Sequence, residues 1–186
     1  MFTQIVNNMS FSFETNNKVF SPLNADKGTL AMLSVVDFSP DDKLLDLGCG
    51  YGIVGIYAAK LLHPQNIAMC DNDINCIELS ARNAELNNAG DLKIVLSDGF
   101  ENIHDTDFSL ILSNPPYHVD FSVPKHFIEK GFNRLRIGGK MYMVTKRKDW
   151  YKNKLSAIFG GVKIFEIDGY FVFCAEKRNA KYANSK

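Results

Sequence analysis

A glycine-rich turn between a short apolar strand and an apolar helix constrains the fold of this chain more than any other feature. The predicted strand over 43–47 leads into Gly48, Gly50 and Gly52, and an apolar helix then runs to about His63. Glycine lets the backbone turn tightly and approach a ligand closely, and the helix behind it presents unpaired N–H groups and a partial positive charge. The pattern therefore predicts a cofactor-binding loop, which suits a carboxylate or a phosphate equally well.

Strands and helices alternate along the rest of the chain. We expect further strands over 67–71, 92–97, 108–113 and 140–145 and helices over 73–88, 124–137 and 149–159. Two last apolar runs, 162–167 and 170–175, meet at Asp168-Gly169, which is a strong hairpin signal. The alternation predicts an α/β fold, a doubly wound, Rossmann-like sheet of seven mostly parallel strands with a C-terminal antiparallel hairpin and helices on both faces.

Length and composition fit one compact domain. A chain of 186 residues, of which 46% are apolar and 12% aromatic, can fill a single sizeable core. We expect an N-terminal extension over 1–36 that packs on a main domain over 37–178, followed by a tail over 179–186. Within the extension, Asp26 is placed to start a helix that reaches about Val36.

Charge and cysteine usage limit the functional classes. The formal net charge is 0, so any affinity for nucleic acid must come from a local patch. No apolar run reaches the ~18 residues of a membrane span, and the N-terminus lacks a basic segment followed by a long apolar one. The four cysteines have no C-x-x-C spacing and the four histidines form no ligand pair. We therefore expect a cytoplasmic protein without a metal, a disulfide framework or membrane association.

Acidic residues stand at the ends of three successive predicted strands. Asp46 precedes the glycines, Asp71 ends the next strand, and Asp98 follows the third. Asp71 lies about 20 residues past the loop, where a ribose-binding acid is expected. The loop also fits the dinucleotide pattern G-x-G-x-x-G, but the charge of Asp46 would oppose a pyrophosphate and attract an ammonium group. Structural alternatives exist, because Asp73 could cap the next helix and Asp71 or Asp98 could form turns. In succession at strand ends, the acids favour S-adenosylmethionine.

The tetrad Asn114-Pro115-Pro116-Tyr117 follows the apolar run 108–113 directly. It offers an amide oxygen, backbone carbonyls held by rigid prolines and a ring for stacking, which together form a clamp for a planar amino or amide group. The structural alternative is a strand-ending turn with a core tyrosine, because Asn-Pro is a common turn signal.

A basic cluster over 146–154 leaves the predicted strand 140–145. Its cations and the only tryptophan, Trp150, could bind an RNA backbone and stack on a base. The alternative is a solvated helix start on which Trp150 covers the core. His118 follows the tetrad and could contact the substrate.

In order and spacing, these motifs resemble class I S-adenosylmethionine-dependent methyltransferases that modify amino or amide nitrogens. The stretch 19–33 and the tetrad with His118 further resemble the small-domain branch that contains the bacterial 16S ribosomal RNA guanine-N2 methyltransferases. The resemblance covers about residues 10–178. The sequence differs from this branch at one point. The best-characterised enzymes of the branch carry an additional domain of similar size ahead of the domain that this chain resembles.

The resemblance implies a role for each motif. The expected S-adenosylmethionine-binding residues are Asp46, Gly48, Cys49, Gly50, Asp71, Asn72, Asp98, Gly99 and Asn114. The expected catalytic residues are Asn114, Pro115, Pro116 and Tyr117. The expected substrate-binding residues are Tyr117, His118, Arg147, Lys148 and Trp150.

The implied reaction is methylation of the exocyclic amine of guanine in ribosomal RNA, with the RNA or the small ribosomal subunit as partner. Adenine N6 in RNA or DNA, or a glutamine amide in a protein, also fits the tetrad. Two different classes remain open, a dinucleotide-dependent oxidoreductase and a non-catalytic RNA-binding module with a cofactor-like pocket. Asp46 and the tetrad disfavour the first, and the intact motifs disfavour the second.

Overall fold

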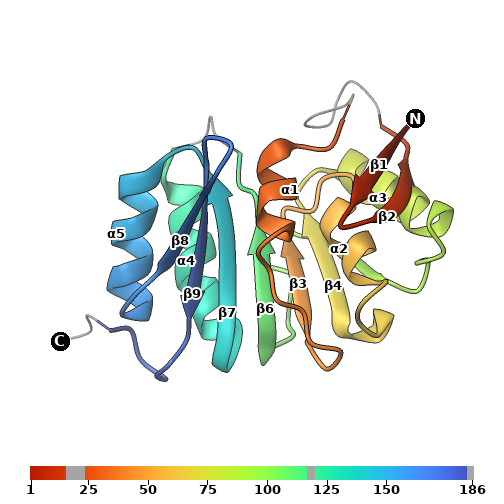
Figure 1. The fold of residues 1–186 in the computed structure, drawn as a ribbon. Coiled ribbons are helices and arrows are strands. Elements are labelled where there is room, and N and C mark those ends of the chain that lie inside the picture. The colour runs from red at the N-terminus through yellow and green to blue at the C-terminus, as the bar shows by residue number, and fades with distance from the viewer. Residues whose placement is uncertain (16–23, 117–119, 184–186) are drawn as a thin grey trace.

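A computed structural model describes residues 1–15, 24–116 and 120–183 (Figure 1). Its strands are β1 (Phe2–Val6), β2 (Met9–Phe13), β3 (Leu44–Leu47), β4 (Ile67–Asp71), β5 (Lys93–Leu96), β6 (Phe108–Ser113), β7 (Leu135–Thr145), β8 (Lys163–Ile167) and β9 (Tyr170–Glu176). Its helices are α1 (Lys27–Leu33), α2 (Ile53–Ala58), the short 3-10 helix η1 (Pro64–Asn66), α3 (Ile74–Leu86), α4 (Ser122–Arg134) and α5 (Lys148–Phe159).

The central sheet has seven strands in the order β5-β4-β3-β6-β7-β9-β8. Strands β3 to β7 pair in parallel, whereas β9 pairs antiparallel with both β7 and β8. The hairpin turn lies at Asp168 and Gly169, whose φ angles are 49° and 78°. The predicted α/β fold class, a doubly wound and mostly parallel sheet with a C-terminal antiparallel hairpin, is therefore confirmed.

Helices cover both faces of this sheet (Figure 1). Helices α1, α2 and α3 and the β1–β2 hairpin share one core with side chains such as Leu44, whereas α4 and α5 share the other with side chains such as Leu45. Neighbouring residues of a strand point to opposite faces, so β3 supplies both cores alternately. A parallel sheet buried on both faces requires this near-continuous apolar strand sequence.

The β1–β2 hairpin is joined to α3 by two asparagine side chains. Asn83 and Asn87, one helical turn apart, exchange hydrogen bonds of 2.7–3.1 Å with the backbone of Glu14 and Ser12. The two side chains pair with backbone N–H and C=O groups on the outer edge of the hairpin, as the backbone of a neighbouring strand would.

Several element bounds differ from the sequence-based expectations. Helix α1 ends at Leu33 and not near Val36, and α2 ends at Ala58 and not near His63, because the chain continues as turns after each. The helix that was expected to run to Gly138 ends at Arg134, and Leu135 begins β7 instead, with Gly138 at φ 80°. Helix α3 does begin after the cap Asp73. Its apolar spacing predicts a buried face of Ile74, Ile77, Ala81 and Ala84, which is wrong because Ile74 is 51% exposed. The face that is buried consists of Cys76, Leu79, Ser80, Asn83 and Ala84.

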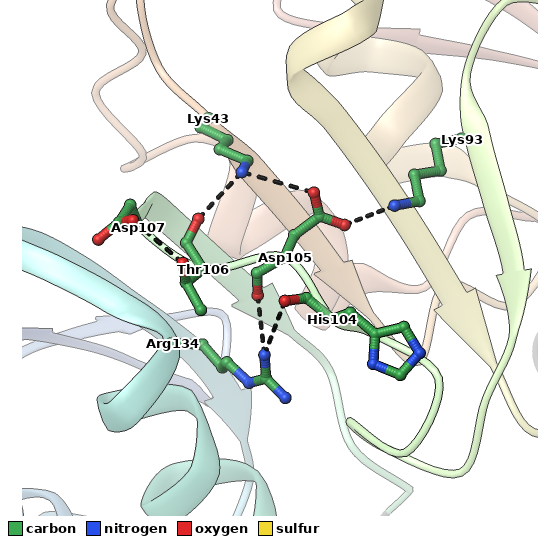
Figure 2. A network of polar contacts seen from close by, with 7 residues as sticks. All are labelled: Lys43, Lys93, His104, Asp105, Thr106, Asp107 and Arg134. Atoms are coloured by element: carbon green, nitrogen blue, oxygen red, sulfur yellow. Dashed lines mark hydrogen bonds and ion pairs between the residues drawn. The ribbon is translucent and has the colours of Figure 1, made fainter.

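A polar network joins the amino ends of three strands, opposite the edge that carries the acids (Figure 2). The Asp105 carboxylate lies 3.6 Å from Lys43 Nζ and 2.5 Å from Lys93 Nζ, and these cations hold the pKa of Asp105 below its usual range. Arg134 donates to the carbonyls of His104 and Asp105 at 3.0 and 3.2 Å. The network ties the loop before β6 to the starts of β3 and β5 and to the end of α4.

Within the described ranges, no helix is long and apolar enough to cross a membrane.

Gly55→Ala should lower the free energy of unfolding. A Cβ at Gly55 would lie 2.4 Å from Met69 Sδ and 2.6 Å from Met69 Cγ, so the fully buried Met69 side chain would have to shift within the core. Overpacking of this kind costs about 1–3 kcal/mol, which exceeds the helix-propensity gain of up to about 1 kcal/mol. Urea unfolding measures the difference, with Gly161→Ala as the control because a Cβ there meets nothing within 4 Å. A Gly55→Ala protein as stable as the control would contradict this packing.

Candidate active site

A pocket of about 360 Å³ opens at the carboxyl ends of β3, β4, β5 and β6. The strand order reverses direction between β3 and β6, and ligands of open α/β sheets bind at such a switch point. Ten of the predicted site residues line the pocket: Gly48, Cys49, Gly50, Asp71, Asn72, Asp98, Gly99, Asn114, Pro115 and Pro116. The strand-tip motifs, which lie between Gly48 and Pro116 in the sequence, thus meet in one cavity.

The glycine-rich loop is held against the end of β4 by its own backbone. The N–H groups of Gly48 and Cys49 both donate to the Cys70 carbonyl at 2.9 Å, and the Gly50 N–H donates to Asp71 Oδ2 at 2.9 Å. Gly48 and Gly50 have φ angles of 79° and 56°, a conformation that glycine adopts without strain. These hydrogen bonds fix the loop and the Asp71 carboxylate relative to each other.

Asp71 and Asp98 stand on neighbouring strand tips of the pocket wall. Asp71 Oδ1 also accepts from the Asp73 N–H at 3.0 Å, and each carboxylate oxygen still has lone-pair capacity for a ligand hydroxyl. Asp98 is exposed, and beside it the Gly99 carbonyl accepts from Ser97 Oγ at 3.0 Å. Val123 and Phe127 of α4 add an apolar side to the pocket.

Asp46 does not line the pocket but lies buried beneath the loop. Its carboxylate accepts from the Gly55 N–H at 3.1 Å, which connects β3 to the first turn of α2. Burial raises the pKa of Asp46 to about 7, opposed by the Gly55 hydrogen bond and reinforced by the charge of Asp71. Direct contact between Asp46 and a cofactor stays a prediction. In this geometry the Asp46 side chain supports the glycine-rich loop from below.

Asn114 closes the pocket at the end of β6. Its Nδ2 donates to Asp26 Oδ1 at 2.7 Å and to Thr29 Oγ1 at 2.9 Å. Ser113 Oγ donates to the Leu47 carbonyl at 2.8 Å, which joins the ends of β6 and β3. Tyr117 and His118 lie outside the described residues.

The three predicted substrate-binding residues of the basic cluster do not line the pocket. Arg147 and Lys148 are exposed, whereas Trp150 is partly buried. The Trp150 ring stacks on Phe121 with a centroid distance of 4.4 Å, and the Arg147 guanidinium lies 5.1 Å from the Phe121 ring centroid. This packing anchors the start of α4 to α5 and favours the structural interpretation of Trp150 over base stacking.

Several residues that the sequence analysis did not assign to the site also line it, among them Asp26, Thr29, Tyr51 and Asp73. Asp26 and Thr29 belong to the predicted N-terminal extension, so this segment contributes to the pocket. The Tyr51 hydroxyl is buried and has no hydrogen-bond partner among the described residues. Burial and the charge of Asp26 raise the Tyr51 pKa, which keeps the hydroxyl a proton donor. A ligand acceptor would satisfy it.

The charge of the pocket discriminates between cofactors. Its described lining contains four carboxylates, Asp26, Asp71, Asp73 and Asp98, and neither lysine nor arginine. Such a lining repels a pyrophosphate and attracts a ligand that carries sulfonium and ammonium groups. In the part of the chain that the structure describes, no group of three or more His, Cys, Asp or Glu side chains could hold a metal ion.

A family model for the methyltransferase small domain matches residues 10–174, nearly the whole chain. The chain belongs to this family. It is an S-adenosylmethionine-dependent methyltransferase by family, and S-adenosylmethionine is its cofactor. The glycine-rich loop, the acids and the unpaired Tyr51 donor fit that cofactor.

Comparisons with single proteins agree with this assignment. The chain is 31% identical over 176 residues to the uncharacterized protein YbxB of Bacillus subtilis, covering 91% of this chain and 88% of that one. It is 26% identical to ribosomal RNA large subunit methyltransferase G of Yersinia enterocolitica, covering 89% of this chain but 43% of the relative. The fold is similar to that of the Thermus thermophilus 16S rRNA N2 G1207 methyltransferase, solved with AdoMet and guanosine, with a TM-score of 0.86 and 26% identity over 95% of this chain and 50% of that one.

Proposed function

We propose that this protein transfers a methyl group from S-adenosylmethionine to the exocyclic N2 amine of guanine in ribosomal RNA. The observation that carries the proposal is the position of Asn114-Pro115-Pro116, which places an amide and a rigid carbonyl in the wall of an acidic cofactor pocket. The names of the Yersinia and Thermus relatives support a ribosomal RNA substrate, and the Thermus title supports guanine N2. The chain spans about half the length of these two relatives, so their substrates enter here as proposals.

The clamp solves a chemical difficulty of this reaction. The exocyclic amine of guanine is a weak nucleophile because its lone pair delocalises into the ring. Asn114 and the Pro115 carbonyl accept the two N–H bonds, localise the lone pair on nitrogen and aim it at the methyl group. The cofactor supplies an activated methyl group. The nitrogen becomes cationic during transfer and releases its proton afterwards, so the chain needs no strong general base.

The remaining site residues receive roles by their position around the pocket. We assign Asp71 to the ribose hydroxyls, Asp98 to the adenine amine, and Gly48 and Gly50 to the methionine moiety. Tyr117 would stack on the guanine, which must leave a helical stack to reach it. The protein would act in the cytoplasm on RNA or on the small ribosomal subunit.

Asp71→Ala should weaken binding of S-adenosylhomocysteine by roughly 1.5–3 kcal/mol, the range for a hydrogen bond to a charged group. The variant loses the acceptor for the ribose and also the anchor of the Gly50 and Asp73 N–H groups. Calorimetry measures the affinity, with exposed Asp91→Ala as the control. Unchanged affinity in Asp71→Ala, or binding of NAD by the wild type, would contradict the assignment of this pocket.

Replacing Arg147, Lys148 and Lys152 together by alanine should weaken RNA binding and reduce its dependence on salt. All three cations are exposed next to the carboxyl end of β7, the edge of the sheet at which the pocket opens. Each phosphate contact that is lost lowers the slope of log K against log salt by about 0.7–0.9. Binding titrations at several salt concentrations measure the slope. Equal slopes for variant and wild type would favour the solvated-helix alternative.

Deletion of the gene tests the proposed substrate in the cell. Mass spectrometry of nucleosides from ribosomal RNA should show less N2-methylguanosine in cells that lack the protein, with recovery when the wild-type gene is restored. Restoring the Asn114→Ala gene should not bring the nucleoside back. Loss of N6-methyladenosine instead would favour an adenine acceptor, and unchanged ribosomal RNA would exclude the proposal.

A further inference from the structure

A trio of hydrogen-bonded side chains joins the end of β6 to the start of α1. Asn114 Nδ2 lies 2.7 Å from Asp26 Oδ1 and 2.9 Å from Thr29 Oγ1. Asp26 caps α1 by accepting from the Thr29 N–H at 3.0 Å, and the Thr29 side chain is buried. All three residues line the pocket. The trio is therefore part of the cofactor site and is built around the residue that carries the proposed clamp.

These contacts determine which way the Asn114 amide points. A carboxylate oxygen accepts hydrogen bonds and does not donate, so the Asn114 atom at 2.7 Å from Asp26 must be the nitrogen. An amide nitrogen has two hydrogens, and Asp26 and Thr29 take both of them. Rotating the amide by 180° would place two oxygens in contact. Asn114 can consequently present only its oxygen, a hydrogen-bond acceptor, to a substrate.

We infer that Asp26 and Thr29 are positioning residues, which lock the Asn114 amide so that the site accepts groups that donate N–H and rejects groups that only accept. This inference rests on the proposed function, since it specifies how the clamp recognises an exocyclic amine. The Asp26 charge also polarises the amide through the hydrogen bond and makes its oxygen a stronger acceptor. That effect grows in importance as the amine nitrogen gains positive charge during transfer.

Nuclear magnetic resonance of protein labelled with ¹⁵N-asparagine tests the lock without any reaction. The Asn114 side-chain signal is assigned by its loss in Asn114→Ala. Both amide protons should exchange slowly with solvent in the wild type and in Thr29→Ser, which keeps a hydroxyl. Exchange should be roughly tenfold faster or more in Thr29→Val and in Asp26→Ser, as expected when one hydrogen bond is removed. Serine retains a capping oxygen for α1 but is too short to reach Asn114 as well.

Single-turnover methylation of ribosomal subunits from cells that lack the protein adds the functional readout. In Asp26→Ser and Thr29→Val the rate should fall on the order of tenfold to a hundredfold, because misplacing a group that aligns the substrate can slow a reaction by up to about a hundredfold. RNA affinity should change little because phosphate contacts dominate it. Thr29→Ser should recover most of the rate. Asp91→Ser, an exposed position in the turn before β5, is the control.

The two measurements separate the possible failures. If the wild type does not methylate the subunits, the proposed function fails, and the exchange rates alone decide whether the lock exists. If the wild type is active while Thr29→Val and Asp26→Ser keep wild-type rates, the positioning inference is overturned and the proposed function stands. Fast exchange of the Asn114 amide protons in the wild type would also overturn it. Melting temperatures of all variants identify any loss of fold.

Discussion

Replacing Asn114 by alanine should slow methyl transfer about a hundredfold or more while cofactor binding and fold remain intact. As the amine nitrogen that receives the methyl group gains positive charge, its N–H groups become stronger hydrogen-bond donors. The hydrogen bond to the Asn114 oxygen then tightens. Asn114 therefore stabilises the transition state more than the bound substrate, and losing this difference together with alignment costs about 3 kcal/mol. Single-turnover kinetics with labelled S-adenosylmethionine measure the rate.

The matched control for this variant is Asn133→Ala, which removes an exposed asparagine side chain from α4, outside the pocket. It should methylate at the wild-type rate. Calorimetry with S-adenosylhomocysteine should give similar affinities for both variants and the wild type. A wild-type rate for Asn114→Ala would exclude a mechanism centred on the tetrad, whereas loss of cofactor affinity would show that Asn114 acts mainly in binding.

The stability of the free protein should decrease as pH rises from about 4 to 7, and Asp46→Asn should remove much of this decrease. The Asp46 pKa is about 7 in the folded protein against an ordinary value of 3.8. Between these values the folded state holds a proton that the unfolded state has lost. This proton binding stabilises the folded protein fully below the Asp46 pKa of the unfolded chain. The stabilisation is lost as pH rises to the Asp46 pKa of the folded protein. For about three pKa units it amounts to at most about 4 kcal/mol.

Urea unfolding between pH 4.5 and 8 measures this effect. Asp46→Asn should resemble the wild type in stability at the acid end and exceed it at pH 8, since the neutral amide can still accept the Gly55 hydrogen bond. Asp91→Asn, a change of an exposed carboxylate, should follow the wild type throughout. Parallel profiles for Asp46→Asn and the wild type would show that the buried carboxylate does not hold its proton to neutral pH.

The sequence predicted the fold class because its periodicity and turn signals were strong. Apolar runs of strand length alternate with helical segments, and Asp168-Gly169 supplies the two positive φ angles that a tight hairpin needs. The pocket followed from the same topology, because the carboxyl ends of parallel strands meet at one edge of a sheet. Asp71, Asp98 and Asn114 were assigned to the site individually and come together there.

Local patterns could not locate the boundary between α4 and β7. Leu135 is apolar and falls on the helical spacing after Ile128 and Phe132, so it fits a helix as well as a strand. Gly138 and Gly139 are typical of a helix end, but they lie inside β7, where Gly138 has a positive φ and the pairing with β6 shifts register. The tertiary pairing of Leu135 with Phe108 decides the outcome.

The contacts around Asn114 and Asp46 were also beyond local patterns. Asp26 and Thr29 lie 88 and 85 positions away from Asn114 and meet it only because α1 packs beside the end of β6. Asp46 occurs on the same side of β3 as Leu44 and therefore points under α2 instead of into the pocket. The division of the chain at residue 36 stays a prediction, although residues on both sides of it line the site.

Methylation in vitro tests the central claim most directly. Purified protein is incubated with S-adenosylmethionine labelled in its methyl group and with ribosomal subunits from cells that lack the protein. The RNA is then digested to nucleosides for mass spectrometry. The account predicts that the label appears in N2-methylguanosine for the wild type and is nearly absent for Asn114→Ala. Label in N6-methyladenosine, label in ribosomal protein, or no label at all would contradict it.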